Sequence, residues 1–215
     1  MLIPFNTIYY TLKLLNIDIK GILHIGAHEC EELEAYLNNN IDATNIVWID
    51  AIKEKVDQAI ARGIPNVFNA VIHDKEENIT FKITNNGQSS SILDLDIHLK
   101  YYPGIQVVEN RILKTTTLYN FFNTYSLNTH TYNFWNLDIQ GTELNALKSA
   151  GNIIDSVDAI YVEVNMEHLY KDCPLIEELD IFLSKKGFDR TMIESSGAGW
   201  GDALYIRKCY LNKTT

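Results

Sequence analysis

Two acidic residues and an amide follow apolar runs in the second half of the chain. Asp138 ends the run "YNFWNLD", and Glu163 and Asn165 end "YVEVN". Such runs predict strands, and the ends of parallel strands meet at one edge of a sheet, so we expect these side chains to lie together. Asp138 would act as a general base towards a substrate hydroxyl, or the three oxygens would hold Mg²⁺ or another divalent cation that lowers the hydroxyl pKa. Glu163 could equally support nearby backbone or an arginine.

His168 follows in "NMEHLYKDC", which we predict to be a loop or a short helix above these strand ends. An ordinary imidazole exchanges a proton near neutrality, so His168 is a further candidate catalytic group. The alternative is a solvent-exposed or capping histidine. His28, in the first loop, is a rival base.

The first loop, "HIGAHECEE", follows a short apolar run and predicts a tight strand-to-helix turn at Gly26. In open α/β sheets this turn is the usual place for a nucleotide. Here it carries one glycine, and four glutamates lie between Glu29 and Glu34, which would repel a pyrophosphate at the helix start. The loop therefore favours a phosphate-free nucleoside with a cationic end, such as S-adenosylmethionine, over NAD. The alternative is an acid-rich helix start that binds nothing.

Trp200 and Asp202 fall in the glycine-rich stretch "GAGWGDAL", which we predict to be a turn. An aromatic ring beside a carboxylate can hold a sugar, by stacking on its apolar face and by hydrogen bonds to its hydroxyls. A tight β-turn with an interior tryptophan is the equal alternative.

Strands and helices must alternate to position these groups, and the hydrophobic pattern predicts that they do. Helical spacing and strand-like runs alternate with short loops, which is typical of βαβ units in a doubly wound sheet. A polar loop with glycine and serine, residues 84–96, is long enough to be functional. The predicted strands are 21–25, 45–50, 66–72, 78–83, 132–139, 157–164 and an antiparallel pair at 189–195 and 202–208, and the predicted helices are 6–15, 31–40, 53–63, 115–126, 142–151 and 173–188.

Length and composition indicate one domain, residues 1–215, with a helical extension at 1–20 and a catalytic core at 21–207. The formal charge of −10 disfavours a nucleic-acid partner. Three scattered cysteines and the absence of a long apolar run or a basic leader predict a cytoplasmic protein away from the membrane. A homo-oligomer is left open.

The motifs "HIGAHECEE", "WIDA", "NAVIHD", "NNGQSSSI", "TTTLYNF" and "LDIQGTELNALKSA" occur in this order. With them the chain resembles the FkbM family of S-adenosylmethionine-dependent methyltransferases over roughly residues 20 to 207. The most specific piece begins at Asp138 and is similar to the family signature Asp-x-Glu-Gly-x-Glu. It departs at Gln140, where the family usually has glutamate, and again at Asp50 and Ala51, where members typically carry Glu-Pro.

The resemblance implies a class I methyltransferase fold, Rossmann-like, with a seven-stranded, mostly parallel sheet, helices on both faces and an antiparallel edge strand. It also implies O-methylation of sugar or secondary-metabolite hydroxyls. Asp138, Glu163 and His168 are then the expected catalytic groups. The expected substrate contacts are Gln140, Asn165, Trp200 and Asp202, and the expected cofactor contacts are Gly26, Ala27, His28, Glu29, Asp50, Ala51, Asn69, Ala70, Ser90 and Asp138.

The sequence therefore predicts an S-adenosylmethionine-dependent O-methyltransferase for a hydroxyl of a sugar, a nucleotide sugar or a glycan. A methyltransferase for a non-sugar small molecule is the first alternative. A binding protein that has lost catalysis is the second, and Gln140 is the residue that favours it.

Overall fold

The computed structural model describes residues 1–212 and contains a seven-stranded main sheet. Its strand order is β3-β2-β1-β7-β8-β10-β9, all parallel up to β8, with β10 antiparallel to both of its neighbours. The order reverses between β1 and β7, which are consecutive in the sheet but far apart in the chain. The strands are β1 (Ile22–Ile25), β2 (Ile46–Asp50), β3 (Val67–Asn69), β7 (Phe134–Leu137), β8 (Ala159–Asn165), β9 (Phe188–Ser195) and β10 (Trp200–Arg207).

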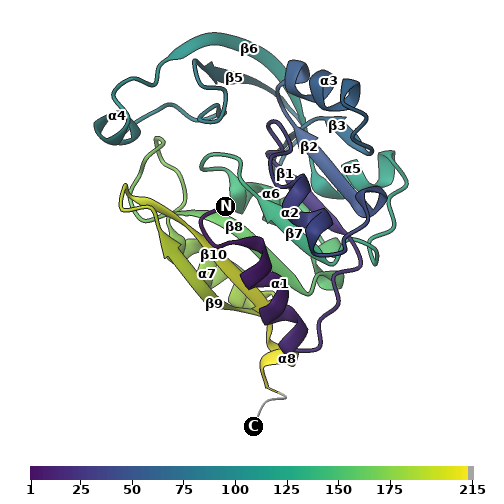
Figure 1. The fold of residues 1–215 in the computed structure, drawn as a ribbon. Helices are drawn as coiled ribbons and strands as arrows, with labels where there is room; N and C mark the ends of the chain where they lie inside the picture. The colour runs from purple at the N-terminus through teal and green to yellow at the C-terminus, as the bar shows by residue number, and fades with distance from the viewer. Residues whose placement is uncertain (213–215) are drawn as a thin grey trace.

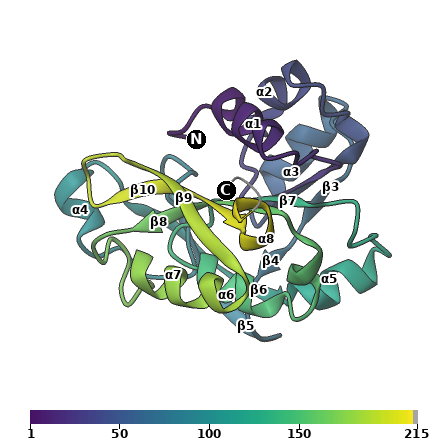
Figure 2. The same cartoon turned by 90° about the horizontal axis from the view of Figure 1, so that it is seen from below.

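Helices cover both faces of this sheet (Figure 2). The first face carries α1 (Phe5–Leu14), α2 (Leu33–Asn38) and α3 (Lys53–Ala61), and the second carries α5 (Leu118–Thr124), α6 (Glu143–Ser149) and α7 (Ile176–Lys185). The remaining helical turns are α4 (His98–Tyr101), α8 (Lys208–Leu211), η1 (Ala43–Asn45) and η2 (Ile153–Ser156). The doubly wound fold predicted from the sequence is confirmed, with the antiparallel strand β10 one position in from the edge.

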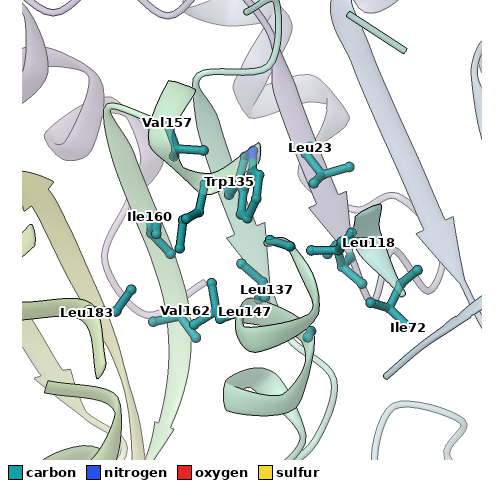
Figure 3. Close-up of a cluster of buried hydrophobic side chains, with 14 of the residues drawn as sticks. Leu23, Ile72, Leu118, Trp135, Leu137, Leu147, Val157, Ile160, Val162 and Leu183 are labelled. Atoms are coloured by element: carbon teal, nitrogen blue, oxygen red, sulfur yellow. The ribbon is translucent and has the colours of Figure 1, made fainter. Parts of the chain in front are cut away.

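Successive side chains of the central strands point into two different cores because the side-chain period of a strand is two. On β7 and β8, Trp135, Leu137, Ile160 and Val162 pack against α5, α6 and α7 (Figure 3). The alternate positions face α1 and α2, where Trp48 of β2 is fully buried. Towards the carboxyl ends of the strands this second set turns polar. The site residues therefore lie on the face that carries α1.

A second, three-stranded sheet lies beside the first and was only partly predicted (Figure 1). It consists of β4 (Val71–Ile72), β5 (Asn78–Thr84) and β6 (Val107–Thr116), in the order β4-β6-β5. The strand predicted at 66–72 divides at Ala70 between β3 and β4, because the chain leaves the main sheet there. β6 was missed, since one of its faces is exposed and its apolar alternation is weak.

Several predicted boundaries were wrong by a few residues. Thr115 and Thr116 belong to β6, and Thr117 alone caps α5 by accepting a hydrogen bond from the Asn120 N–H (3.1 Å). α2 starts later than the predicted helix at 31–40, at Leu33. Residues 213–215 of the predicted domain lie outside the described residues.

Candidate active site

A cavity of about 500 Å³ opens beyond the carboxyl ends of β1, β7 and β8, where the strand order reverses. This is the position at which open α/β sheets bind ligands. Its lining includes Gly26 and Asp50, from the ends of β1 and β2, together with Asp138, Glu163 and Asp202, from β7, β8 and β10 or the residue that follows them. The loop between β5 and α4 forms the opposing wall.

The turn after β1 brings two strands into contact at Gly26. Its φ is 88°, and a Cβ built there would lie 1.7 Å from the backbone oxygen of Asp138. Only glycine tolerates both conditions. The N–H groups of Gly26 and Ala27 both donate to the Ile49 oxygen, at 2.9 and 3.0 Å, which fixes the loop on the end of β2.

Asp50 holds the same loop from the other side. Its Oδ2 accepts from the His28 N–H and its Oδ1 from the Ile52 N–H, both at 2.7 Å. Burial raises the pKa of Asp50, and these two backbone N–H groups oppose that shift. Each oxygen keeps a lone pair for a ligand, so Asp50 can both shape the loop and accept hydrogen bonds from ribose hydroxyls.

The predicted cofactor residues divide into two groups. Those that line the cavity are Gly26, His28, Asp50, Ala51, Ser90 and Asp138. Ala27, Glu29, Asn69 and Ala70 are not among the lining residues. Ala27 is buried, Glu29 is exposed and pairs with Lys55, and Asn69 donates to the Asp50 and Ala51 oxygens at 3.0 Å. These contacts support the loop, and the predicted cofactor contacts of the four residues stay predictions.

The chain after β7 makes a tight turn in which two consecutive residues, Gln140 and Gly141, are left-handed, with φ of 57° and 94°. Glu143 holds this turn, since one of its carboxylate oxygens accepts from the Ile139 N–H (2.9 Å) and the Gly141 N–H (3.1 Å). Glu143 is 2% exposed and does not line the cavity. The sequence reading assigned it no role, although it is the last residue of the quoted signature.

Gln140 connects two of the cavity carboxylates, Asp138 and Glu163. Its Nε2 donates to Asp138 Oδ1 at 2.6 Å and to Glu163 Oε2 at 2.9 Å, and its Oε1 accepts from the Tyr170 hydroxyl. Both Gln140 and Tyr170 line the cavity. The amide is thus oriented by three partners, and Tyr170 is a site residue that the sequence did not single out.

The carboxylates raise one another's pKa. Asp138 is exposed to the cavity, but the surrounding protein desolvates its carboxylate, and with the charge of Asp202 this raises its pKa to about 6. Burial raises the pKa of Glu163 well above its usual range, and Asp138 adds to the shift. A group with a raised pKa next to a second carboxylate can accept or release a proton close to neutrality.

Asp202 and Trp200 lie in β10 and not in the predicted turn, which is confined to the residues before Trp200. Asp202 is opposite Glu163 in the β8–β10 register. It is 4% exposed, and its Oδ2 accepts from the Tyr161 hydroxyl and from the Leu2 N–H, the latter at 2.6 Å. The N-terminal segment, predicted only as cover for the core, therefore contacts the site, and in Figure 1 the N-terminus lies close to β8 and β10.

Trp200 also contributes to the cavity wall. Its Nε1 donates to the Tyr102 hydroxyl at 2.9 Å, and both residues line the cavity. Tyr102 directly follows α4, so this hydrogen bond joins β10 to that helical turn. Trp200 and Asp202 both line the cavity from β10, and their contact with a sugar stays a prediction.

His168 and Asn165 are not brought to the cavity. His168 is exposed and its Nδ1 lies 2.9 Å from the Cys173 oxygen, so we remove it from the catalytic candidates. Asn165 is 1% exposed on β8, and its Oδ1 has no hydrogen-bond partner within residues 1–212. It does not line the cavity, which corrects its predicted role as a substrate contact.

The predicted metal ligands do not fit a metal ion. Asp138 and Glu163 converge on the amide nitrogen of Gln140, a hydrogen-bond donor, and Asn165 lies elsewhere. Within the described part of the chain no group of three or more His, Cys, Asp and Glu side chains could hold one. We therefore derive no step through a metal.

His98 is a site residue that the sequence reading missed. It lines the cavity, is 4% exposed, and packs between the rings of Tyr102 and Tyr170, with centroids at 4.9 and 5.4 Å. Its Nδ1 has no hydrogen-bond partner in the described structure. Burial lowers its pKa, which favours the neutral ring. No motif surrounds this histidine, so only the fold reveals it.

Comparison with known proteins places the chain in a family. The family model described as "Methyltransferase FkbM domain" matches residues 24–190. No curated protein matches the chain. Among residues 1–212 no helix has the length and apolar character needed to cross a membrane.

Solved methyltransferase structures align with this chain. An S-adenosylmethionine-dependent methyltransferase from Clostridium acetobutylicum ATCC 824 aligns with a TM-score of 0.50 at 8% identity, over 94% of this chain and 89% of that one. Magnesium protoporphyrin IX methyltransferase from Synechocystis PCC 6803 aligns at 0.48 and 8%, over 94% and 77%. A methyltransferase from Aquifex aeolicus aligns at 0.40 and 12%, over 92% and 88%. At such identities the first of these supports the fold alone.

Proposed function

This chain belongs to the FkbM methyltransferase family, and we propose that it transfers a methyl group from S-adenosylmethionine to a hydroxyl of a sugar or glycan. One observation carries the proposal. A single cavity at the reversal of strand order joins the Gly26–Asp50 loop to the carboxylates Asp138 and Glu163. A donor and an acceptor can therefore occupy adjoining halves of the same space.

The donor end suits an adenosyl group with a cationic tail. S-adenosylmethionine would supply an electrophilic methyl group on a positively charged sulfur. Asp50 offers free lone pairs for ribose hydroxyls, and Gly26 leaves room for close approach to the backbone. The acidic loop favours a ligand without a pyrophosphate, as the charge argument from the sequence requires.

The acceptor end supplies what methyl transfer to a hydroxyl needs, namely alignment and a proton acceptor. Asp138 lies at the junction of the two halves, and its Oδ1 is held by Gln140. Its second oxygen is left to accept a hydrogen bond from the acceptor hydroxyl and to take its proton. Trp200 and Tyr102 provide aromatic surface for a sugar ring.

A binding protein without catalysis remains the competing function, because Gln140 engages both carboxylates at once. The two functions differ in turnover. Cofactor affinity without methylation of any hydroxyl acceptor would favour the binding protein. A methyltransferase for a non-sugar small molecule would turn over only non-sugar acceptors.

The test is formation of S-adenosylhomocysteine by the purified protein with a panel of sugars, glycans and non-sugar alcohols. With the best acceptor, Asp138→Asn should lower kcat by roughly 10²- to 10⁴-fold, because it removes the proton acceptor and keeps the side-chain shape. Asp172→Asn, an exposed aspartate outside the cavity, is the matched control. Unchanged turnover in Asp138→Asn would refute the catalytic role of Asp138.

A further inference from the structure

The cavity is lined by more carboxylates than basic side chains, and its basic side chains are histidines, of which His28 pairs with Glu31 at 2.6 Å. Six carboxylates face it, and no lysine or arginine of residues 1–212 does. The amino group of Met1 lies 3.7 Å from the Glu32 carboxylate. Among residues 1–212 it is the sole ammonium group that lines the cavity. The six carboxylates are Glu31, Glu32, Asp50, Asp138, Glu163 and Asp202.

These carboxylates separate into two groups along the cavity. Asp50 is the last residue of β2, and the two glutamates belong to the segment between β1 and α2. The other three, Asp138, Glu163 and Asp202, lie on or directly after β7, β8 and β10, and the Asp138 backbone packs against Gly26. Apart from the Met1 amino group, whose positive charge acts on Asp138, no lysine or arginine side chain of residues 1–212 lines the cavity to balance this second group.

The wall beside the second group is aromatic. Tyr170 donates to Gln140, which holds Asp138 and Glu163, while Trp200 and Tyr102 are hydrogen-bonded to each other. Carboxylates together with aromatic rings form a typical environment for an alkylammonium group, which gains from both the charge and the ring faces.

His98 provides an independent indication that this end binds a ligand. It is 96% buried against the same tyrosines, lines the cavity, and leaves Nδ1 without a partner among the described residues. A buried polar atom without a hydrogen bond lowers stability, so we expect a ligand group to form the missing hydrogen bond with His98 Nδ1. A neutral imidazole nitrogen can accept a hydrogen bond from an ammonium or a hydroxyl.

We propose that the acceptor carries a protonated amino group close to the methylated hydroxyl, so that it is an amino sugar or a closely related amino alcohol. The inference rests on the proposed methyltransferase function and narrows its substrate class. It excludes sugars linked to phosphate or to a nucleotide, because their anionic groups would face Asp138, Glu163 and Asp202 without a basic partner. It therefore argues against the nucleotide sugars considered from the sequence.

An ammonium group fits this end better than a metal ion does. The Gln140 amide already places a hydrogen-bond donor between Asp138 and Glu163, and an ion would have to displace it. An ammonium adds donors to the lone pairs that remain, without disturbing the amide. The carboxylates thus act as a binding surface for hydrogen-bond donors.

The experiment is calorimetric titration of the protein after saturation with S-adenosylhomocysteine, which cannot react. The probes are glucosamine, galactosamine and mannosamine, each with its N-acetyl derivative, together with glucosamine 6-phosphate and Mg²⁺. In at least one pair the free amine should bind about tenfold or more tightly than its acetylated partner. The phosphate and the metal should bind more weakly than that amine.

Two variants locate the effect. Glu163→Gln and Asp202→Asn should each weaken amine binding about tenfold and leave the N-acetyl derivatives unchanged. The control is Glu194→Gln, an exposed carboxylate opposite Asp202 on β9 that does not line the cavity. Glu194→Gln should change neither the affinity for the amines nor the affinity for the N-acetyl derivatives.

The outcomes separate this inference from the function on which it rests. If S-adenosylhomocysteine itself fails to bind, the proposed function falls and this inference falls with it. If it binds, but acetylated or phosphorylated sugars bind as tightly as every amine, or no amine binds, the amino acceptor is refuted and the methyltransferase remains. Tighter binding of Mg²⁺ would replace the amine with a metal ion.

Discussion

At the scale of single residues, the buried carboxylate of Glu143 holds the signature turn, and its protonation should make the stability of the protein depend on pH. It accepts two backbone hydrogen bonds from that turn and is 2% exposed. Burial raises its pKa to about 7, and the backbone N–H groups oppose the shift. The folded state therefore binds a proton to Glu143 more tightly than the unfolded chain does.

The pH dependence of stability follows from that raised pKa. The contribution of Glu143 is fully present below its ordinary value near 4.5 and is lost as the pH rises through about 7. Glu143→Gln keeps an acceptor oxygen and cannot ionise. We expect the wild-type free energy of unfolding to fall relative to the variant by up to about 3 kcal/mol between pH about 5 and about 8.

Urea unfolding of both proteins across that range measures this difference. Glu177→Gln, which removes an exposed carboxylate from α7, is the control. A wild-type to Glu143→Gln difference that does not change with pH would contradict a raised pKa at Glu143.

Single residues were predictable where a motif fixed their place in the chain. Gly26, Asp50 and Asp138 were found because they end predicted strands, and strand ends of a parallel sheet converge. His98 and Tyr170 could not be found, because their approach to the cavity depends on how a long polar loop folds back. His168 was misplaced for the same reason, since its loop turns the ring outward.

At the scale of elements, the turn after β1 is the structure on which the proposed donor binding depends. The absence of a Cβ at Gly26 lets β1 approach the end of β7, within reach of the Asp138 oxygen. Gly26→Ala should cost more than about 3 kcal/mol of unfolding free energy and abolish cofactor binding, because both the clash and the positive φ oppose a side chain.

Gly63→Ala separates the effect of the positive φ from the effect of the clash. Gly63 ends α3 with a φ of 80°, and a Cβ there meets nothing within 4 Å. It should cost only about 1 kcal/mol and leave cofactor binding intact. Thermal unfolding and cofactor titration of both variants provide the measurement. Equal losses in the two would show that close packing at Gly26 is unimportant.

Elements of the main sheet were predictable, because buried parallel strands are short apolar runs and their helices repeat at helical spacing. The small sheet was not, since β6 presents exposed Val108 and Ile112 beside charged residues and pairs with β5 through its backbone. Trp200 and Asp202 were assigned to a turn because the glycines around them resemble one. The pairing with β8 overrides that local signal.

At the scale of the whole molecule, the N-terminal segment links the ends of the chain across the site. The Leu2 N–H donates to Asp202 and the Ile3 N–H to Tyr161, while α1 is held separately by its buried residues Phe5 and Ile8. The segment before α1 therefore contacts the proposed acceptor end, whereas the packing of α1 on the domain does not depend on that contact.

Deletion of Leu2–Pro4 tests that division. We expect a loss of about 1–3 kcal/mol of stability, mainly from the buried Ile3, and a larger loss of acceptor affinity than of donor affinity. Leu14→Ala, an exposed position on α1, should alter neither. Equal losses of donor and acceptor affinity would contradict a specific role at the acceptor end.

The central claim is that the cavity at the reversal of strand order binds S-adenosylmethionine. Calorimetric titration of the purified protein with S-adenosylmethionine, S-adenosylhomocysteine and NAD, each with and without Mg²⁺, tests it most directly. We predict binding of both adenosyl ligands at roughly micromolar Kd, none of NAD, and no requirement for the metal. Failure of both adenosyl ligands to bind would contradict the account and leave the Gly26 loop as a structural turn.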